Sequence, residues 1–101
     1  MEFINPYWSN KLRINALQRW VIVQSIIYYE FGNTLVSDMV FDANAKQLVQ
    51  LQKDFPNDAK QSDYWYLFYD FDGTTGFDLY SRLNKKDKQY LTHLAKYVQR
   101  I

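Results

Sequence analysis

Two carboxylates and a pair of tyrosines lie close together in the sequence, in a pattern that could recognise a charged ring. Asp38 and Asp42 are four residues apart, and on a helix that begins near Ser37 they share one face. Two like charges at this spacing repel each other unless something binds them. Tyr28 and Tyr29 end the preceding helical pattern, so a short reversal of the chain would bring their rings over this acidic face.

The chemistry that such a group can perform is recognition. Aromatic faces stack on a flat ring and attract a positive charge, while carboxylates bind a cation or accept hydrogen bonds from ribose hydroxyls. The pattern indicates a site for a flat, cationic, hydroxylated ligand, with five candidate residues: Tyr28, Tyr29, Asp38, Phe41 and Asp42. The same residues also suit a simpler arrangement, in which two tyrosines pack in the core and a solvated acidic turn starts the next helix.

A second carboxylate-rich segment, Asp70-Phe71-Asp72-Gly73-Thr74, follows an apolar run and is similar to the first motif of the haloacid-dehalogenase phosphatases. That chemistry needs a downstream Ser or Thr, a Lys and further carboxylates on a parallel sheet, and only 27 residues follow Thr74. A calcium loop would need a third ligand before the glycine and a terminal Glu. We therefore expect a tight turn in which Asp side chains accept hydrogen bonds from backbone amides, with no metal.

The remaining polar residues suggest no chemistry. His93 is the only histidine, and we expect it to lie on the surface or in packing contacts. The cluster Lys85-Lys86-Asp87-Lys88 is short and mixed in sign, which is typical of a solvated helix start. We do not expect direct nucleic-acid binding.

Helices must position these residues. Apolar residues at helical spacing predict a first helix over 10–31, capped by Asn10 and ended by Gly32 and Asn33. Ser37 and Pro56 bound a second helix. We expect a loop over 57–63, an aromatic extended or short helical segment over 64–71, a turn over 72–76, a short helix over 77–83, and a last helix that Asn84 caps and that ends near Arg100.

Composition limits the class of protein. With 101 residues, the chain predicts one small all-α domain of about four helices spanning 1–101. The absence of cysteine excludes disulfides, thiol nucleophiles and cysteine-based metal sites. No run approaches the ~18 apolar residues of a membrane span. The first ten residues lack the pattern of a signal peptide. We expect a cytoplasmic protein that does not contact membranes.

Residues 27–42 (IYYEFGNTLVSDMVFD) and 48–56 (LVQLQKDFP) resemble the N-terminal Ia domain of NAD-dependent DNA ligases. That family has a Tyr-Tyr or Tyr-His pair, a short loop, Ser/Pro-Asp, Tyr-Asp, Leu, Leu-Glu and a closing Pro. Order and spacing agree over about residues 14–57. The whole chain is also similar to small stand-alone phage proteins related to the ligases, whose C-terminal half has a segment like residues 70–79 (DFDGTTGFDL).

The resemblance implies that NAD, or its nicotinamide mononucleotide (NMN) half, binds at Tyr28, Tyr29, Asp38, Phe41 and Asp42. Phe41 stands where the family usually has Tyr, which keeps stacking and loses a hydroxyl. Ligation needs a lysine in a Lys-x-Asp-Gly motif, and the nearest string here has Asp70 in its place. We therefore expect a non-catalytic module and no enzyme.

An alternative function is protein interaction. Successive large rings cannot all point inward from one short segment, so some of Tyr64, Trp65, Tyr66, Phe68 and Tyr69 should face solvent or a neighbour. A phage-type factor of this kind would bind a host or phage protein in the host cytoplasm, such as a ligase, a replication factor or a defence nuclease in the manner of an anti-CRISPR inhibitor. It could also self-associate. The same rings could simply cover the core between the second and last helices.

Overall fold

A computed structural model describes residues 7–100 and folds them into helices joined by short loops, with no strand in that part of the chain. The elements are α1 (Asn10–Ser25), the π-helical turn η1 (Ile26–Glu30), α2 (Asp38–Asp54), α3 (Pro56–Lys60), α4 (Trp65–Phe68), α5 (Leu79–Arg82) and α6 (Lys85–Arg100). The predicted helical class is confirmed. The six α-helices of residues 7–100 outnumber the expected four because two of them are single turns within predicted loop or aromatic segments.

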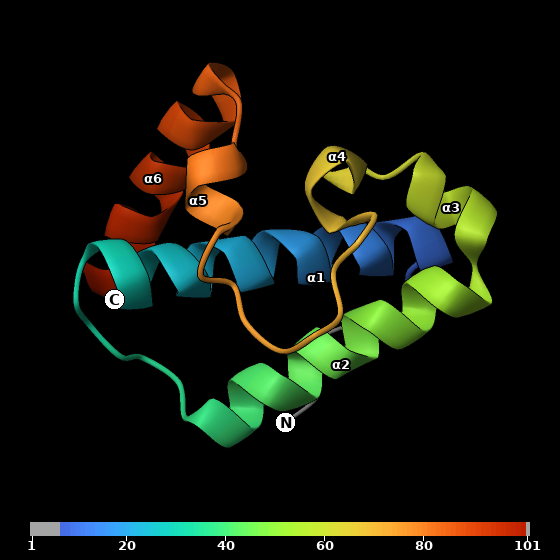
Figure 1. Ribbon diagram of the computed structural model, residues 1–101, viewed down its shortest axis with the longest axis horizontal. Coiled ribbons are helices and arrows are strands. Elements are labelled where there is room, and N and C mark those ends of the chain that lie inside the picture. Colours follow the sequence, from blue (N-terminus) through green and yellow to red (C-terminus); the bar gives the residue numbers. More distant parts are fainter. Residues whose placement is uncertain (1–6, 101) are drawn as a thin grey trace.

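The first helix is the centre of the molecule, and the other elements pack around it. Figure 1 shows α2 crossing α1 on one side, α3 and α4 near the start of α1, and α5 and α6 near its end. Every residue from 21 to 27 is buried, so the end of α1 and the start of η1 have no solvent-exposed face. The radius of gyration is 12.8 Å, close to the ~13 Å of a compact domain of this length.

The first helix starts and ends differently from the prediction. Ser9 is the N-cap, and its hydroxyl accepts a hydrogen bond from the backbone amide of Leu12 at 3.2 Å. Asn10, the predicted cap, is the first helical residue. The predicted continuation to Phe31 is a π-helical turn, in which the Phe31 amide donates to the carbonyl of Ile26. Gly32 then adopts a left-handed conformation with φ of +67°, as predicted, whereas Asn33 does not have a positive φ.

The second helix begins as the sequence predicts. Ser37 caps it and accepts a hydrogen bond from the Val40 amide at 3.2 Å. It ends at Asp54, before Pro56. The expected loop over 57–63 is wrong in its first half because Pro56 occupies the first turn of α3, where its missing N–H costs nothing. Ala59 of that turn is fully buried.

The C-terminal part of the chain follows the predicted order. The aromatic segment contains one helical turn, α4, and Asn84 caps α6 by accepting a hydrogen bond from the Asp87 amide at 2.8 Å. The short helix predicted over 77–83 is confined to Leu79–Arg82.

A buried amide network joins three of these segments. Gln18 is fully buried, and its Nε2 donates to Gln52 Oε1 at 3.0 Å and to Ser62 Oγ at 2.8 Å. Its Oε1 accepts from the Tyr64 amide at 3.2 Å. Gln52 Nε2 in turn donates to the Phe68 carbonyl at 3.2 Å. The network therefore ties α1 to α2 and to the loop and turn that lead into α4.

Candidate functional site

A cleft of about 300 Å³ lies where the end of η1, the loop before α2, the start of α2 and the loop before α5 meet. All five residues predicted to bind a ligand line it. The full lining is Gln24, Ser25, Tyr28, Tyr29, Asn33, Thr34, Leu35, Val36, Asp38, Phe41, Asp42, Thr74 and Thr75.

The π-helical turn supplies the aromatic wall. The rings of Tyr28 and Tyr29 meet edge to face with centroids 4.8 Å apart, and the two residues are 53% and 40% exposed. Tyr29 also meets the Phe77 ring edge to face at 5.4 Å. Such contacts fix ring orientation while leaving part of each tyrosine open. The alternative, in which these tyrosines pack in the core, does not describe this arrangement.

The first two turns of α2 supply the acidic wall. Asp38 and Asp42 are both exposed and line the cleft from one helix face. Phe41 lies between them in the sequence and is half-buried, with its ring centroid 5.9 Å from that of Trp20. Phe41 therefore packs against the core on one side, whereas the two carboxylates are exposed to solvent.

A third wall comes from the loop over residues 70–78, for which the sequence predicts only a tight turn. Thr74 and Thr75 line the cleft opposite the helices. The Thr75 hydroxyl lies 3.0 Å from that of Tyr29 and accepts a hydrogen bond from the Phe77 amide at 3.1 Å. This contact joins residues 46 positions apart, so no local sequence pattern predicts it.

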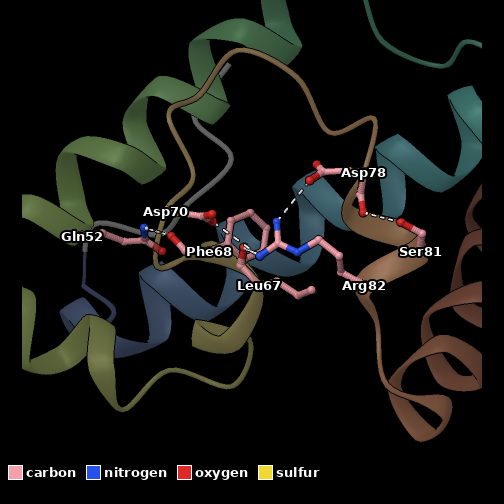
Figure 2. Close-up of polar contacts among 7 residues, drawn as sticks. All are labelled: Gln52, Leu67, Phe68, Asp70, Asp78, Ser81 and Arg82. Atoms are coloured by element: carbon pink, nitrogen blue, oxygen red, sulfur yellow. Dashed lines mark hydrogen bonds and ion pairs between the residues drawn. The ribbon is translucent and has the colours of Figure 1, made fainter.

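Arg82 holds the two ends of this loop together. Its guanidinium pairs with Asp70 at 3.4 Å and with Asp78 at 3.2 Å, and it donates to the Leu67 carbonyl at 3.2 Å, as Figure 2 shows. The first aspartate of the phosphatase-like motif therefore closes the base of the loop. Figure 1 shows the segment between α4 and α5 descending to α2 before it rises to α5.

Within the loop, Asp72 forms the predicted turn. Its Oδ1 accepts hydrogen bonds from the Thr74 hydroxyl at 2.7 Å and from the Thr74 amide at 3.0 Å. These bonds, the hydroxyl bond first, lower the pKa of Asp72 below its ordinary value. Gly73 has a φ of +85°, which L side chains rarely adopt, and a Cβ there would lie tightly against the side chain of Val49 on α2. The loop therefore needs a glycine to approach α2.

The loop also packs closely on the end of α1. A side chain at Gly76 would overlap the hydroxyl of Ser25. Ser25 is 3% exposed, lines the cleft, and its Oγ has no hydrogen-bond partner among the described residues. A buried hydroxyl without a partner is costly, so a ligand that reached it would gain a hydrogen bond. No local sequence pattern singles out Ser25 as a cleft residue.

The electrostatics of the cleft are one-sided. It has two carboxylates, and no lysine or arginine lines it in the part of the chain that the structure describes. Amides of Gln24 and Asn33 and hydroxyls of Thr34, Thr74 and Thr75 complete its polar surface. The arrangement can hold a flat cation with several hydroxyl groups, and it offers no ionic partner to a phosphate.

The aromatic residues proposed for an interface do not form one surface. Tyr64 and Phe68 are buried in the core, Trp65 is half-buried, and Tyr66 and Tyr69 are exposed at 39% and 62%. Tyr66 donates a hydrogen bond to Asp87 at 2.7 Å, which ties α4 to α6. Burial raises the pKa of Tyr64 to about 12, and the nearby Asp87 carboxylate adds to the shift.

Two further features concern metals and membranes. Among residues 7–100 no three His, Cys, Asp or Glu side chains gather as a metal ion would require. No helix of the same span has the length and apolar character needed to cross a bilayer.

Comparisons with protein-family models, with curated proteins and with solved structures found no match to the chain.

Proposed function

We propose that this protein is a non-catalytic module that binds a nicotinamide nucleotide, NAD or its NMN half, in the cleft between η1, α2 and the loop over 70–78. The observation that carries the proposal is that Tyr28, Tyr29, Asp38, Phe41 and Asp42 line a single cleft together with a set of hydroxyl groups. Their spacing in the sequence is the one that resembles the ligase Ia domain.

The lining matches the nicotinamide riboside part of such a ligand. The nicotinamide ring of NAD is flat and positively charged, which suits aromatic faces beside two carboxylates. Its ribose carries hydroxyls that Asp38, Asp42 and the threonines can bond. The cleft volume of about 300 Å³ is at the small end of the ~300–1,000 Å³ of ligand sites. It is therefore suited to one half of a dinucleotide.

We propose that the phosphate of NMN lies outside the cleft. It carries negative charge, the cleft carries two carboxylates, and no described lysine or arginine lines the cleft. A phosphate held inside the cleft would be repelled by the two carboxylates, and this repulsion costs free energy unless solvent screens the charges. We therefore expect the phosphate to point into solvent, and nicotinamide riboside to bind at least as well as NMN.

Titration calorimetry with nicotinamide riboside, NMN and NAD tests the proposal. A double variant, Asp38→Asn/Asp42→Asn, keeps the shape of the cleft and removes both charges; we expect its affinity to fall at least tenfold, since hydrogen bonds to charged groups are worth about 1.5–3 kcal/mol each. The matched control is Asp54→Asn/Asp58→Asn, outside the cleft. The proposal is wrong if millimolar ligand does not bind, or if both double variants behave alike.

A second candidate function, protein interaction through the aromatic segment, has one observation in its favour. Tyr69 is 62% exposed at the end of α4, one helical turn after the half-buried Trp65. Exposed rings of this kind anchor partners. Sedimentation of wild type and Tyr69→Ser tests the self-association form of this idea. A wild type that remains monomeric at high concentration would contradict that form.

A further inference from the structure

Charge is distributed unevenly along the chain, although the formal net charge is only +1. The last 19 residues carry five lysines and arginines and one carboxylate. The first 82 carry seven cations and ten carboxylates. All five of the C-terminal cations lie on α6 (Lys85–Arg100), so one helix is strongly basic on a molecule that is otherwise acidic.

The fold turns this helix so that its basic residues face outward. Leu91 and Ala95 are buried against the rest of the molecule, which fixes the inner side. The opposite side carries a row of basic and aromatic residues spaced by four, three, four and three positions: Lys86, Tyr90, His93, Tyr97 and Arg100. At 1.5 Å per residue this row is about 21 Å long. Its tyrosines are 52% and 62% exposed.

A second row of cations runs beside the first. Lys85, Lys88 and Lys96 line an open groove of about 350 Å³ together with Tyr80 of α5, Gln89, Thr92 and His93. The Lys88 ammonium lies 4.7 Å from the centre of the Tyr80 ring. The groove therefore contains three ammonium groups and no carboxylate from the described chain.

Few carboxylates balance these cations. Within residues 7–100 the ion pairs are the two that Arg82 makes with Asp70 and Asp78. The single acidic residue of α6, Asp87, accepts a hydrogen bond from Tyr66 on the side facing α4. The lysines of the outer face are thus available to an external anion.

We propose that the outer face of α6 binds single-stranded nucleic acid. A row of cations matches the regular negative charge of a phosphate backbone. Exposed tyrosines between them offer stacking surfaces that suit unpaired bases and that a duplex cannot use. The sequence predicts no direct nucleic-acid binding because the net charge is near zero and the cluster Lys85–Lys88 is short and mixed in sign. The folded helix adds two tyrosines, His93, Lys96 and Arg100 to the exposed side of the same helix. This inference is independent of the cleft.

Fluorescence anisotropy with a labelled 20-nucleotide oligothymidine, over a series of salt concentrations, tests the proposal with the whole chain. With four to five cations engaged, we expect a slope of log K against log salt of about −3, from about −0.7 per contact. The variant Lys86→Gln/Lys96→Gln/Arg100→Gln should lose at least tenfold in affinity and reduce the slope by about 2. The matched control, Lys11→Gln/Lys46→Gln/Lys53→Gln, removes as much charge from other exposed positions and should change affinity by less than about threefold.

A second variant separates stacking from charge. Tyr90→Ser/Tyr97→Ser should weaken oligothymidine binding about tenfold or more, leaving the salt slope and the weaker binding of a duplex unchanged. Circular dichroism checks that each variant is folded. Absence of binding at 50 mM salt overturns the proposal, and so does an equal loss in the control triple variant. Binding of polyaspartate as tight as that of oligothymidine would assign the face to an acidic protein, and a dimer that dissociates in the α6 variants would assign it to a second copy.

Discussion

At the scale of single residues, the contact between Tyr29 and Thr75 joins two walls of the cleft. Their hydroxyls lie 3.0 Å apart and connect the π-helical turn to the loop over 70–78. The contact joins Tyr29, which the sequence predicts to bind a ligand, to Thr75, which it does not. Its role is to position the Tyr29 ring, whose other neighbours are Tyr28 and Phe77.

A double-mutant cycle measures this positioning effect. We expect Thr75→Val and Tyr29→Phe each to weaken nicotinamide riboside binding a few-fold, and the double variant to lose little more than either single one, since a neutral hydrogen bond is worth about 0.5–1.5 kcal/mol. Thr34→Val, another threonine of the cleft lining, is the comparison, and its effect should add to that of Tyr29→Phe. Additive losses from Thr75→Val and Tyr29→Phe would show that the two hydroxyls act separately.

The buried Tyr64 predicts a pH dependence of stability. Its pKa is raised to about 12 by burial, against about 10 in an unfolded chain. Above pH 10 the unfolded chain releases this proton first, so stability is complete below pH 10 and falls as the pH rises toward 12. We expect the melting temperature of Tyr64→Phe to fall less steeply over this interval than that of wild type. In Tyr97→Phe, which alters an exposed ring, the profile should match wild type; equal slopes in Tyr64→Phe would contradict the assignment.

At the scale of elements, the loop between α4 and α5 adds the third wall of the cleft beside η1 and α2. Arg82 bridges Asp70 and Asp78 at its two ends, as Figure 2 shows. Gly73 and Gly76 let it approach α2 and α1. This wall of the cleft is thus held by an arginine that does not itself line the cleft.

Removing this arginine should loosen the loop more than it destabilises the protein. We expect Arg82→Met to raise hydrogen-exchange rates at the amides of Thr74 and Phe77 and to weaken ligand binding several-fold. The loss of stability should be about 1–2 kcal/mol, since the ion pairs are partly exposed and the bond to the Leu67 carbonyl is also lost. Arg19→Met, at another exposed site, serves as the comparison. Unchanged exchange in Arg82→Met would contradict the bridging role.

The sequence predicted those elements whose signals are local. Ser37, Asn84 and Gly32 mark helix ends through their own side-chain or backbone chemistry, and the structure uses each of them there. The four-residue spacing of Asp38 and Asp42 is also a local signal, and it predicted that the two carboxylates share one face of α2. The π-helical turn was not predicted, because its sequence also suits an ordinary helix end.

Contacts between distant segments could not be predicted in this way. Thr75 lines the cleft because its loop lies against Tyr29, which is 46 positions earlier in the sequence. Gln18 lies among apolar residues of α1, and its partners are 34 to 46 residues away. A single sequence offers no pattern that couples positions so far apart. The third wall of the cleft and the buried network were therefore missed together.

At the scale of the whole molecule, the Gln18 network joins three segments that are distant in the sequence: α1, α2 and the segment that leads into α4. Gln18→Ala would leave the buried Oε1 of Gln52 and the Tyr64 amide without their partner, and would leave the Ser62 hydroxyl with only its bond to the Ala59 carbonyl. Each unsatisfied group costs about 1–3 kcal/mol, so we expect a loss of about 3 kcal/mol or more by urea denaturation. The melting temperature should fall by more than about 10 °C.

The control for this loss is Gln50→Ala on the exposed side of α2, where the side chain bonds only Asp54. Its cost should stay below about 0.5 kcal/mol. A loss below about 1 kcal/mol in Gln18→Ala would mean that the network contributes little, and that apolar packing around α1 alone joins the segments.

The central claim is that the cleft between η1, α2 and the loop over 70–78 is the nicotinamide-nucleotide site. The most direct measurement is a titration of the ¹⁵N-labelled protein with NMN, followed by two-dimensional ¹H–¹⁵N correlation spectra. We predict saturable shifts at the amides of Tyr29, Asp38, Asp42 and Thr75, while those in the middle of α6 stay in place. Spectra that do not change at millimolar NMN, or shifts confined to residues outside the cleft, would contradict the claim.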